Sequence, residues 1–180
     1  MSDLTALSRR SFIMMSVALA ACKPGAKTLD FSGLTMGTSY NVVAVDPTRK
    51  VNEAEAKAQI ESALALVNKQ MSNWDSTSEI SRFNAKTDLG SMGISTDLAK
   101  VMRAAEDVHI ASEGRFDTTM GPLIELWGFG ANGAKHMASD AEIAAAQARS
   151  GHGATLNVGA STLQKRRSDA QVYLSAIGKG

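Results

Sequence analysis

The stretch Gly114–Gly130, GRFDTTMGPLIELWGFG, decides the fold expected of this chain. Gly121-Pro122 predicts the start of a short helix, because proline is favoured at the first helical position, where its missing N–H is not needed. That helix is expected to end at Trp127-Gly128. A preceding helix is expected to start near Thr96 and to run toward Gly114, where glycine suits a C-cap. The segment between them is therefore a connection between two helices.

Two glycine patterns match nucleotide-binding motifs only in their letters. Gly128–Gly133 fits G-x-G-x-x-G, but a dinucleotide-binding loop follows a strand and opens a helix at once. Here a helical turn precedes the pattern and a polar loop follows it. Gly178-Lys179 suggests a P-loop, but Gly180 stands where Ser or Thr is required and Tyr173 stands where the leading glycine belongs. No G-x-S-x-G elbow supports a hydrolase triad.

Caps and apolar spacing predict two long helices. The first runs from Asn52, a favourable N-cap, to about Met71. The second is the helix from Thr96 toward Gly114; His109 within it is interpreted as a surface or packed histidine. Apolar residues recur at helical spacing in both, which predicts a core-facing stripe. The stripes consist of Ile60, Leu64, Val67 and Met71 in the first helix, and of Leu98, Val101, Met102, Ala105 and Val108 in the second.

Strands are expected at three places. Thr38–Val45 is β-rich and partly alternating, and Thr155–Val158 and Gln171–Leu174 have similar composition. The basic run Lys165–Arg167 is interpreted as a solvated turn between the last two strands. Met71–Asn84 breaks the helical period and is rich in Ser, Asn and Asp, so it is predicted to be a loop.

A capping box across Ser139–Glu142 predicts an alanine-rich helix that ends near Gly151. The chain has 180 residues, a normal size for one domain. Hydrophobic residues make up 44% and charged residues 21%, as in chains that bury a core. Because strands and helices interleave irregularly, the predicted fold class is α+β.

The first 21 residues are predicted to be an export signal rather than part of the domain. Arg9-Arg10 precedes an apolar stretch, Phe12–Ala21, as in twin-arginine signals. That stretch is too short to span a bilayer, which needs about 20 apolar residues. Leu19–Cys22 resembles a lipobox, and Cys22 is the only cysteine, so lipidation of Cys22 is expected. Residues 22–34 are then a lipidated cysteine and tether, and residues 35–180 are the domain.

The charge of the exported part excludes a nucleic-acid-binding role. The chain has 19 basic and 18 acidic residues; without Arg9, Arg10 and Asp3 each sign has 17. A neutral domain lacks the basic surface that nucleic acid requires. We therefore expect no nucleic-acid partner, and membrane contact only through the lipid anchor.

Four segments together resemble the ApbE family of FAD:protein FMN transferases, over about Thr35–Gly180. The most specific is the opening stretch, with F-D-x-T-x-G-P-L followed by L-W-G-F-G. The others come in the family's order: Thr35–Thr38 (TMGT), Met71–Asn84 (MSNWDSTSEISRFN) and Leu174–Gly180 (LSAIGKG). The resemblance implies an ApbE-like mixed sheet-and-helix domain.

The resemblance also implies an activity. The family splits the pyrophosphate of FAD with a divalent metal, usually Mg²⁺, and attaches FMN to a threonine hydroxyl of a target protein. Typical targets are subunits of membrane redox complexes that face the periplasm. The export signal independently predicts that compartment, the periplasmic side of a bacterial membrane, with the inner membrane favoured. FAD as substrate, Mg²⁺ and a target protein are thus the expected cofactors and partners.

Site residues are implied position by position. Met36 and Trp74 match residues that contact the flavin nucleotide, and Lys179 matches a lysine that does so. Arg115, Phe116 and Asp117 match the nucleotide-holding stretch, where the family usually has A-F-D, so Arg115 is a departure. Tyr173 stands where the family usually has an acid that contacts FAD. Ala176 matches a position whose backbone carbonyl binds the metal.

The resemblance further implies that the C-terminal part of the domain is missing, because the family's side-chain metal ligands, an Asp and a Thr, lie beyond this last motif. One backbone carbonyl cannot satisfy the octahedral oxygen coordination of Mg²⁺. Three functions therefore stay open: a flavin transferase, an FAD-binding lipoprotein without catalysis, and an inactive truncated fragment.

Overall fold

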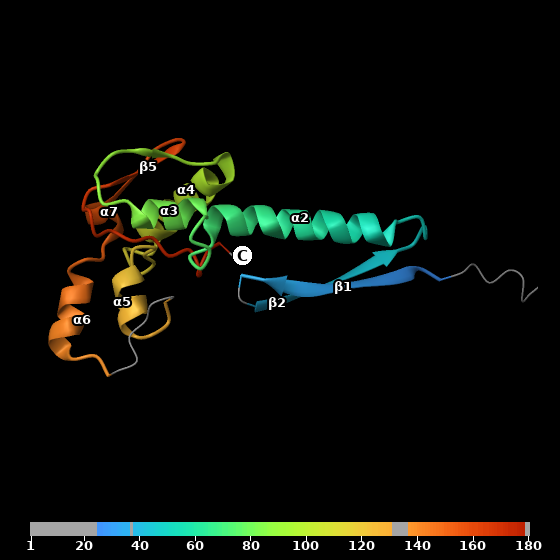
Figure 1. Cartoon of the computed structure of the whole chain (residues 1–180), viewed down its shortest axis with the longest axis horizontal. Helices are drawn as coiled ribbons and strands as arrows, with labels where there is room; N and C mark the ends of the chain where they lie inside the picture. The colour runs from blue at the N-terminus through green and yellow to red at the C-terminus, as the bar shows by residue number, and fades with distance from the viewer. Residues whose placement is uncertain (1–24, 37, 131–136, 179–180) are drawn as a thin grey trace, which may run out of the picture.

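The computed structural model describes residues 25–36, 38–130 and 137–178, and it has two parts. A compact part holds most helices and a small sheet, and a long arm extends from it (Figure 1). The mixture of helices and small antiparallel sheets confirms the α+β class. The elements are β1 (Lys27–Thr35), β2 (Thr38–Asp46), α2 (Glu53–Met71), α3 (Glu79–Ala85), β3 (Met92–Gly93), α4 (Thr96–Ala111), α5 (Gly121–Leu126), α6 (Asp140–Gln147), α7 (His152–Thr155), β4 (Leu156–Val158) and β5 (Thr162–Lys165).

The arm is a β-hairpin lying alongside α2 (Figure 1). Strand β1 pairs antiparallel with β2, from Lys27 opposite Asp46 to Thr35 opposite Thr38. The hairpin thus turns at Met36, whose φ of 48° is left-handed, a conformation that suits two-residue hairpin turns. Strand β1 corrects the predicted tether over 22–34, because residues from Lys27 onward are paired. Buried Leu29 and Phe31 alternate with exposed Asp30 and Ser32, which is the pattern of a half-buried strand and is a signal that the sequence analysis overlooked.

Asp46 connects the hairpin to the arm's helix. Its carboxylate accepts hydrogen bonds from the backbone N–H groups of Thr48, Arg49 and Val51. These bonds, that of Val51 first, lower the pKa of Asp46 to about 2. At the other end, the predicted N-cap is confirmed: the Asn52 side chain accepts from the N–H groups at positions 54 and 55.

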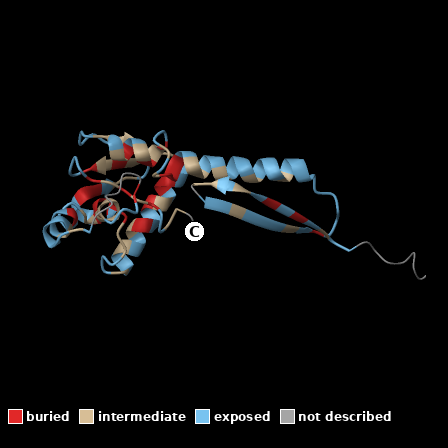
Figure 2. Ribbon diagram, turned by 60° about the horizontal axis from the view of Figure 1, so that its bottom comes forward, coloured by how far each residue is buried: buried red, intermediate tan, exposed pale blue. Residues whose placement is uncertain are grey.

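Helix α2 is less buried than its apolar stripe predicted. Ile60, Leu64 and Val67 are only half-buried, and Met71 alone of that stripe is buried. Figure 2 shows why: buried residues gather in the compact part, at the end of α2 that enters it and in part of the hairpin, while the rest of α2 is mostly exposed. The stripe faces the narrow hairpin over most of its length, and a two-stranded ribbon covers less surface than a full core.

The core of the compact part surrounds α3 and α4. Ile80 and Phe83 of α3 and Leu98 and Met102 of α4 are fully buried. Helix α3 corrects the predicted loop over Met71–Asn84. It has seven residues and starts at an N-cap, Ser78, whose side chain accepts from the N–H of residue 81. Fewer than two helical turns leave too little periodicity for prediction among so many polar residues.

The small sheet has strand order β3-β5-β4, all antiparallel. The predicted strand at Thr155–Val158 is confirmed as β4, beginning at Leu156. The predicted strand Gln171–Leu174 is wrong, because this segment pairs with no strand among the described residues. The interpretation of Lys165–Arg167 as a solvated turn is also wrong at its first residue: Lys165 ends β5 and is 2% exposed.

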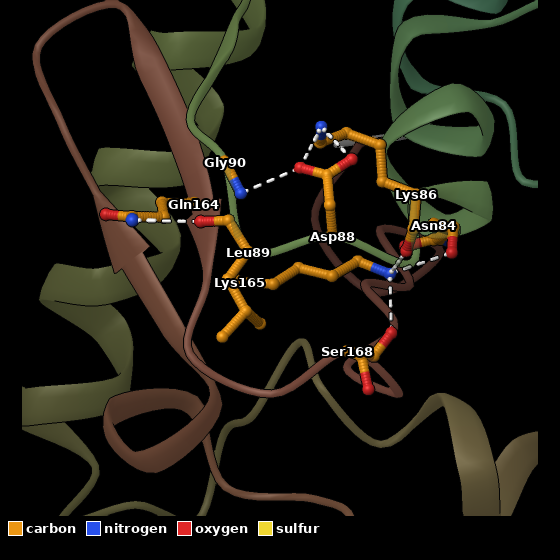
Figure 3. Close-up of polar contacts among 8 residues, drawn as sticks. All are labelled: Asn84, Lys86, Asp88, Leu89, Gly90, Gln164, Lys165 and Ser168. Atoms are coloured by element: carbon orange, nitrogen blue, oxygen red, sulfur yellow. Dashed lines mark hydrogen bonds and ion pairs between the residues drawn. The ribbon is translucent and has the colours of Figure 1, made fainter.

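Lys165 fastens the sheet to the C-terminal end of α3 and to the loop after β5 (Figure 3). Its Nζ donates to the backbone oxygens of Asn84 at 2.8 Å, Lys86 at 2.6 Å and Ser168 at 3.3 Å. It also lies 5.5 Å from the ring centroid of Phe83, within cation–π range. Burial lowers the pKa of Lys165. All three ammonium hydrogens have acceptors, which is how a lysine is accommodated in a core.

The remaining helices, α4, α5 and α6, begin close to the positions predicted from their first residues. Helix α4 begins after Ser95, which caps it, but ends at Ala111, short of Gly114. The positive φ of Glu113 and Gly114, 55° and 80°, turns the chain away after the helix has ended. Helix α5 carries proline in its first turn as predicted. The capping box at Ser139 is formed, although α6 ends at Gln147 rather than near Gly151.

Among the described residues, no helix combines the length and apolarity needed to cross a bilayer. The predicted signal peptide, residues 1–21, and the lipidation site Cys22 lie outside the described residues.

Replacing Lys165 with methionine should lower the free energy of unfolding by about 2–3 kcal/mol. Methionine keeps much of the volume but leaves buried carbonyl oxygens without a donor, and each such loss costs about 1–3 kcal/mol. Urea denaturation measures the change. Lys100→Met is the control, because the Lys100 side chain is 64% exposed and its loss should stay within about 0.5 kcal/mol. Equal changes in the free energy of unfolding for the two variants would show that the hydrogen bonds of Lys165 do not stabilise the fold.

Candidate active site

A cleft of about 400 Å³ opens where the hairpin tip meets the compact part. Four segments contribute its walls: the hairpin turn, the loop after α2, the α5 region and the C-terminal segment. No lining residue among those described has a charged side chain, and aromatic and apolar groups predominate. The lining residues are Met36, Met71, Ser72, Asn73, Trp74, Ile124, Phe129, Tyr173, Leu174, Ser175 and Gly178.

The loop after α2 is held rigid by serine side chains. The Ser72 hydroxyl oxygen accepts from the backbone N–H groups of Trp74 and Asp75, both at 3.1 Å. The Ser72 carbonyl oxygen accepts from the hydroxyls of Ser78 and Ser81. The loop therefore has a fixed shape, and it presents Trp74 with 62% of its surface exposed at the cleft.

Side-chain amides take the place of a partner strand for the C-terminal segment. Asn84 accepts from the Val172 N–H at 2.8 Å and donates to the Val172 carbonyl oxygen at 2.8 Å. Asn73 donates to the same oxygen at 2.7 Å and accepts from the Leu174 N–H at 3.1 Å. Backbone groups buried away from water need such partners. The segment is thus fixed without any sheet.

Tyr173 is set between these anchored neighbours. Its N–H donates to the Thr118 carbonyl oxygen at 2.8 Å. Its hydroxyl donates to the Glu125 carboxylate. Burial, and next the hydrogen bond to Glu125, raise the pKa of the Tyr173 phenol well above its ordinary 10.0. Its ring lies against Gly121, where a Cβ would approach Cδ2 of the ring to 2.9 Å.

Asp117 organises the connection between α4 and α5. One carboxylate oxygen accepts from the Thr119 N–H at 2.7 Å and from the Thr119 hydroxyl at 2.6 Å. The other accepts from the His152 N–H at 3.0 Å. Both oxygens are therefore engaged within the protein, and Asp117 does not line the cleft.

The structure brings together three of the predicted site residues, Met36, Trp74 and Tyr173. Arg115 does not join them: it is exposed, with its guanidinium 3.3 Å from the Glu113 carboxylate. Phe116 is half-buried, and it is also absent from the lining.

Two further predicted positions lie near the chain's end. Ala176 is exposed in the turn that follows the lining residue Leu174. Lys179 lies outside the described residues.

Sequence reasoning missed several lining residues. Asn73 and Phe129 stood within quoted motifs, next to Trp74 and within L-W-G-F-G, and their motif membership was the available signal. Ser175 likewise stood within the quoted segment Leu174–Gly180. Ile124 carried no signal of its own, because its place in the cleft depends on tertiary packing.

A metal site is not complete in this part of the chain. Within residues 25–36, 38–130 and 137–178, no group of three or more His, Cys, Asp or Glu residues could hold a metal ion. The predicted backbone ligand at Ala176 supplies one oxygen. The described residues therefore do not by themselves fit Mg²⁺, which needs six oxygen ligands. The cleft, in contrast, offers mainly aromatic and apolar surface.

The comparisons with known proteins agree on one family. The model of the ApbE family matches residues 36–180. A "FAD:protein FMN transferase" of Vibrio cholerae is 35% identical over 165 residues, 90% of this chain and 48% of the relative. One of Haemophilus influenzae is 40% identical over 120 residues, 66% of this chain and 35% of the relative. The chain thus spans about half, or less, of the length of these relatives.

Solved structures give the same result. The flavin transferase ApbE from Vibrio cholerae superposes with a TM-score of 0.80 at 35% identity, covering 86% of this chain and 50% of that one. The apo flavinyl transferase ApbE of Pseudomonas stutzeri superposes with a TM-score of 0.73 at 29% identity, covering 83% and 48%.

The phenol of Tyr173 should stay protonated where ordinary tyrosines ionise. Because its pKa is raised, folding favours the protonated form, and no phenolate should appear at this residue between roughly pH 9 and 11. Near-ultraviolet titration of the wild type and of Tyr173→Phe measures this. The two curves should coincide over that range; a missing ionisation step in the variant would contradict the buried contact with Glu125.

Gly121→Ala should destabilise the protein by about 1–3 kcal/mol, because the added methyl group meets the Tyr173 ring and must displace it. Gly93→Ala is the matched control, since a Cβ there meets nothing within 4 Å. Urea denaturation of both compares the cost. A loss in Gly93→Ala as large as that in Gly121→Ala would refute the tight contact.

Proposed function

This chain belongs to the ApbE family, and on that premise we propose that it acts as a FAD:protein FMN transferase. The observation that carries the proposal is the uncharged, aromatic cleft at the junction of the hairpin and the compact part. The names of the similar proteins support the chemistry, because each is called a FAD:protein FMN transferase.

The cleft suits the flavin half of FAD. Trp74 and Phe129 are large aromatic residues that are 62% and 78% exposed, so both leave much apolar surface in contact with water. A planar ring system that covers them would remove that surface from water and could stack on them. The absence of charged groups from the described lining makes it a poor place for the diphosphate. We place the isoalloxazine ring in the cleft and the phosphates outside it.

The proposed reaction is a transfer of FMN from FAD to the target protein. A threonine hydroxyl oxygen of a target protein attacks the phosphorus of the FMN half, a new P–O bond forms, and the pyrophosphate P–O bond to AMP breaks. AMP leaves and the hydroxyl proton is released. Mg²⁺ would neutralise charge on the phosphate oxygens. Ala176 would give one backbone ligand, and the other protein ligands would come from outside the described residues.

The proposed place of action is the periplasmic side of a bacterial inner membrane. The twin arginines Arg9-Arg10 and the lipobox ending in Cys22 support export followed by lipid anchoring. An anchored enzyme would share a surface with its target, which we propose is a periplasm-facing subunit of a membrane redox complex.

A second candidate function is FAD binding without cleavage. The lack of an acidic or histidine metal cluster among the described residues favours it. So does Tyr173, which contributes a protonated phenol to the cleft wall. The two functions differ in one product, since only the transferase or a hydrolase releases AMP.

The decisive experiment incubates the full chain with FAD, MgCl₂ and a periplasm-facing redox subunit as the threonine acceptor, and a parallel sample with EDTA in place of MgCl₂. Flavin fluorescence measures binding and chromatography measures AMP. The transferase predicts saturable binding and Mg²⁺-dependent AMP release. Binding without AMP would favour the second candidate, and no binding would end both.

Trp74→Ala should weaken FAD binding by about fivefold to a hundredfold, because losing one stacking face costs about 1–3 kcal/mol. Phe129→Ala should act in the same direction. Ile110→Ala is the control: this exposed apolar residue of α4 does not line the cleft. Fluorescence titration gives the three dissociation constants. If Trp74→Ala and Ile110→Ala bind FAD equally well, the flavin does not lie in this cleft.

A further inference from the structure

Two histidines outside the cleft stack on each other. The rings of His109 in α4 and His152 in α7 have centroids 5.1 Å apart and planes inclined by 30°. His152 is 3% exposed. His109 is half-buried. A proton added to the buried His152 is poorly solvated, and a charge on the neighbouring His109 ring would repel it at short range.

Both rings hold the segment between α4 and α5. The His109 Nδ1 lies 2.7 Å from the Phe116 carbonyl oxygen, which can only accept, so Nδ1 carries the proton. The His152 Nδ1 lies 3.2 Å from the Thr118 hydroxyl. The His152 Nε2 is buried and has no hydrogen-bond partner among the described residues. When Nδ1 donates to the Thr118 hydroxyl, protonation takes place at Nε2, and the added proton has no acceptor among the described residues.

The same segment reaches the cleft. The Thr118 carbonyl oxygen accepts from the Tyr173 N–H at 2.8 Å, and Tyr173 is part of the cleft wall. The Asp117 carboxylate accepts from the His152 N–H at 3.0 Å. Residues 116–118 are therefore bonded to the histidine pair on one side and to the cleft on the other.

We propose that His109 and His152 are positioning residues for the cleft wall, which hold residues 116–118, and through them Tyr173, in place only while His152 is uncharged. Protonation of His152 would place a cation against the His109 ring and leave a buried N–H without an acceptor. The segment would then shift, and Tyr173 would move with it. The consequence for FAD rests on the proposed function; the movement of Tyr173 does not.

The charges around His152 set the direction of the effect. Burial lowers the pKa of His152 below 6.5, and the charge of His109 lowers it further, while Asp117 and Glu106 oppose this. Helix α7 and strand β4, which pack there, contain no other charged side chain. Since the folded state binds the proton less readily than the unfolded chain, stability is complete above about pH 6.5 and falls as the pH drops toward the lowered pKa.

The test follows the Tyr173 ring by NMR in the full chain from about pH 8 to 5, with the signal assigned from Tyr173→Phe. The proposal expects a shift with a midpoint below that of a free histidine, and its loss in His152→Asn, whose amide can still meet Thr118 but cannot titrate. His109→Asn keeps a donor for the Phe116 oxygen and should move the midpoint upward.

Two results would overturn the proposal: a Tyr173 signal that does not change in the wild type, or one that changes equally in His152→Asn. Because His109→Asn tests the same pair separately, a folding defect in one variant does not hide the answer.

FAD titration over the same pH range tests whether the histidine pair affects FAD binding. The apparent Kd should rise by up to about tenfold per pH unit below the pKa of His152 in the wild type, and should stay flat in His152→Asn. If FAD fails to bind even at the upper pH while Tyr173 still moves, the proposed function fails and the positioning role stands. If the Kd for FAD does not change with pH while Tyr173 moves, the role of the histidine pair in ligand binding is refuted.

Discussion

The hydrogen bonds that two asparagine side chains make to an extended backbone segment are the constraint on which the candidate site depends. Val172 and Leu174 are buried, yet their segment pairs with no strand among the described residues. Asn73 and Asn84 satisfy the backbone groups that a neighbouring strand would otherwise satisfy. Because Asn84 is itself held through its carbonyl oxygen by Lys165, the wall of the cleft is tied to the centre of the sheet.

The cleft joins two parts of unequal burial. The compact part has a core of its own, whereas the hairpin and α2 form a thin layer in which Val43 and Val45 stay more than half exposed. Met36, at the hairpin tip, is what the arm contributes to the cleft. Placing a binding cleft at such a junction lets a ligand contact both parts, so ligand binding would stabilise their arrangement.

The helices could be predicted because their caps form between residues close in the sequence. Features that depend on contacts between distant residues could not. Asn52 and Ser139 cap their helices through bonds within three residues, so sequence alone indicates them. Lys165 was mistaken for a surface residue because two of its three acceptors, the oxygens of Asn84 and Lys86, lie 81 and 79 positions away. Of the site, Met36, Trp74 and Tyr173 followed from family resemblance. The role of Asn73 could not be foreseen, since its partners are about a hundred positions away.

The most direct test of this account is hydrogen exchange at the backbone amides of Val172, Tyr173 and Leu174, followed by NMR with and without FAD. The account predicts slow exchange in the free protein, although no strand covers the segment, because all three amides have side-chain or carbonyl acceptors. It predicts still slower exchange with saturating FAD. Exchange as fast as in an unstructured peptide, or rates that saturating FAD leaves unchanged, would contradict the claim that this segment is the fixed wall of a flavin site.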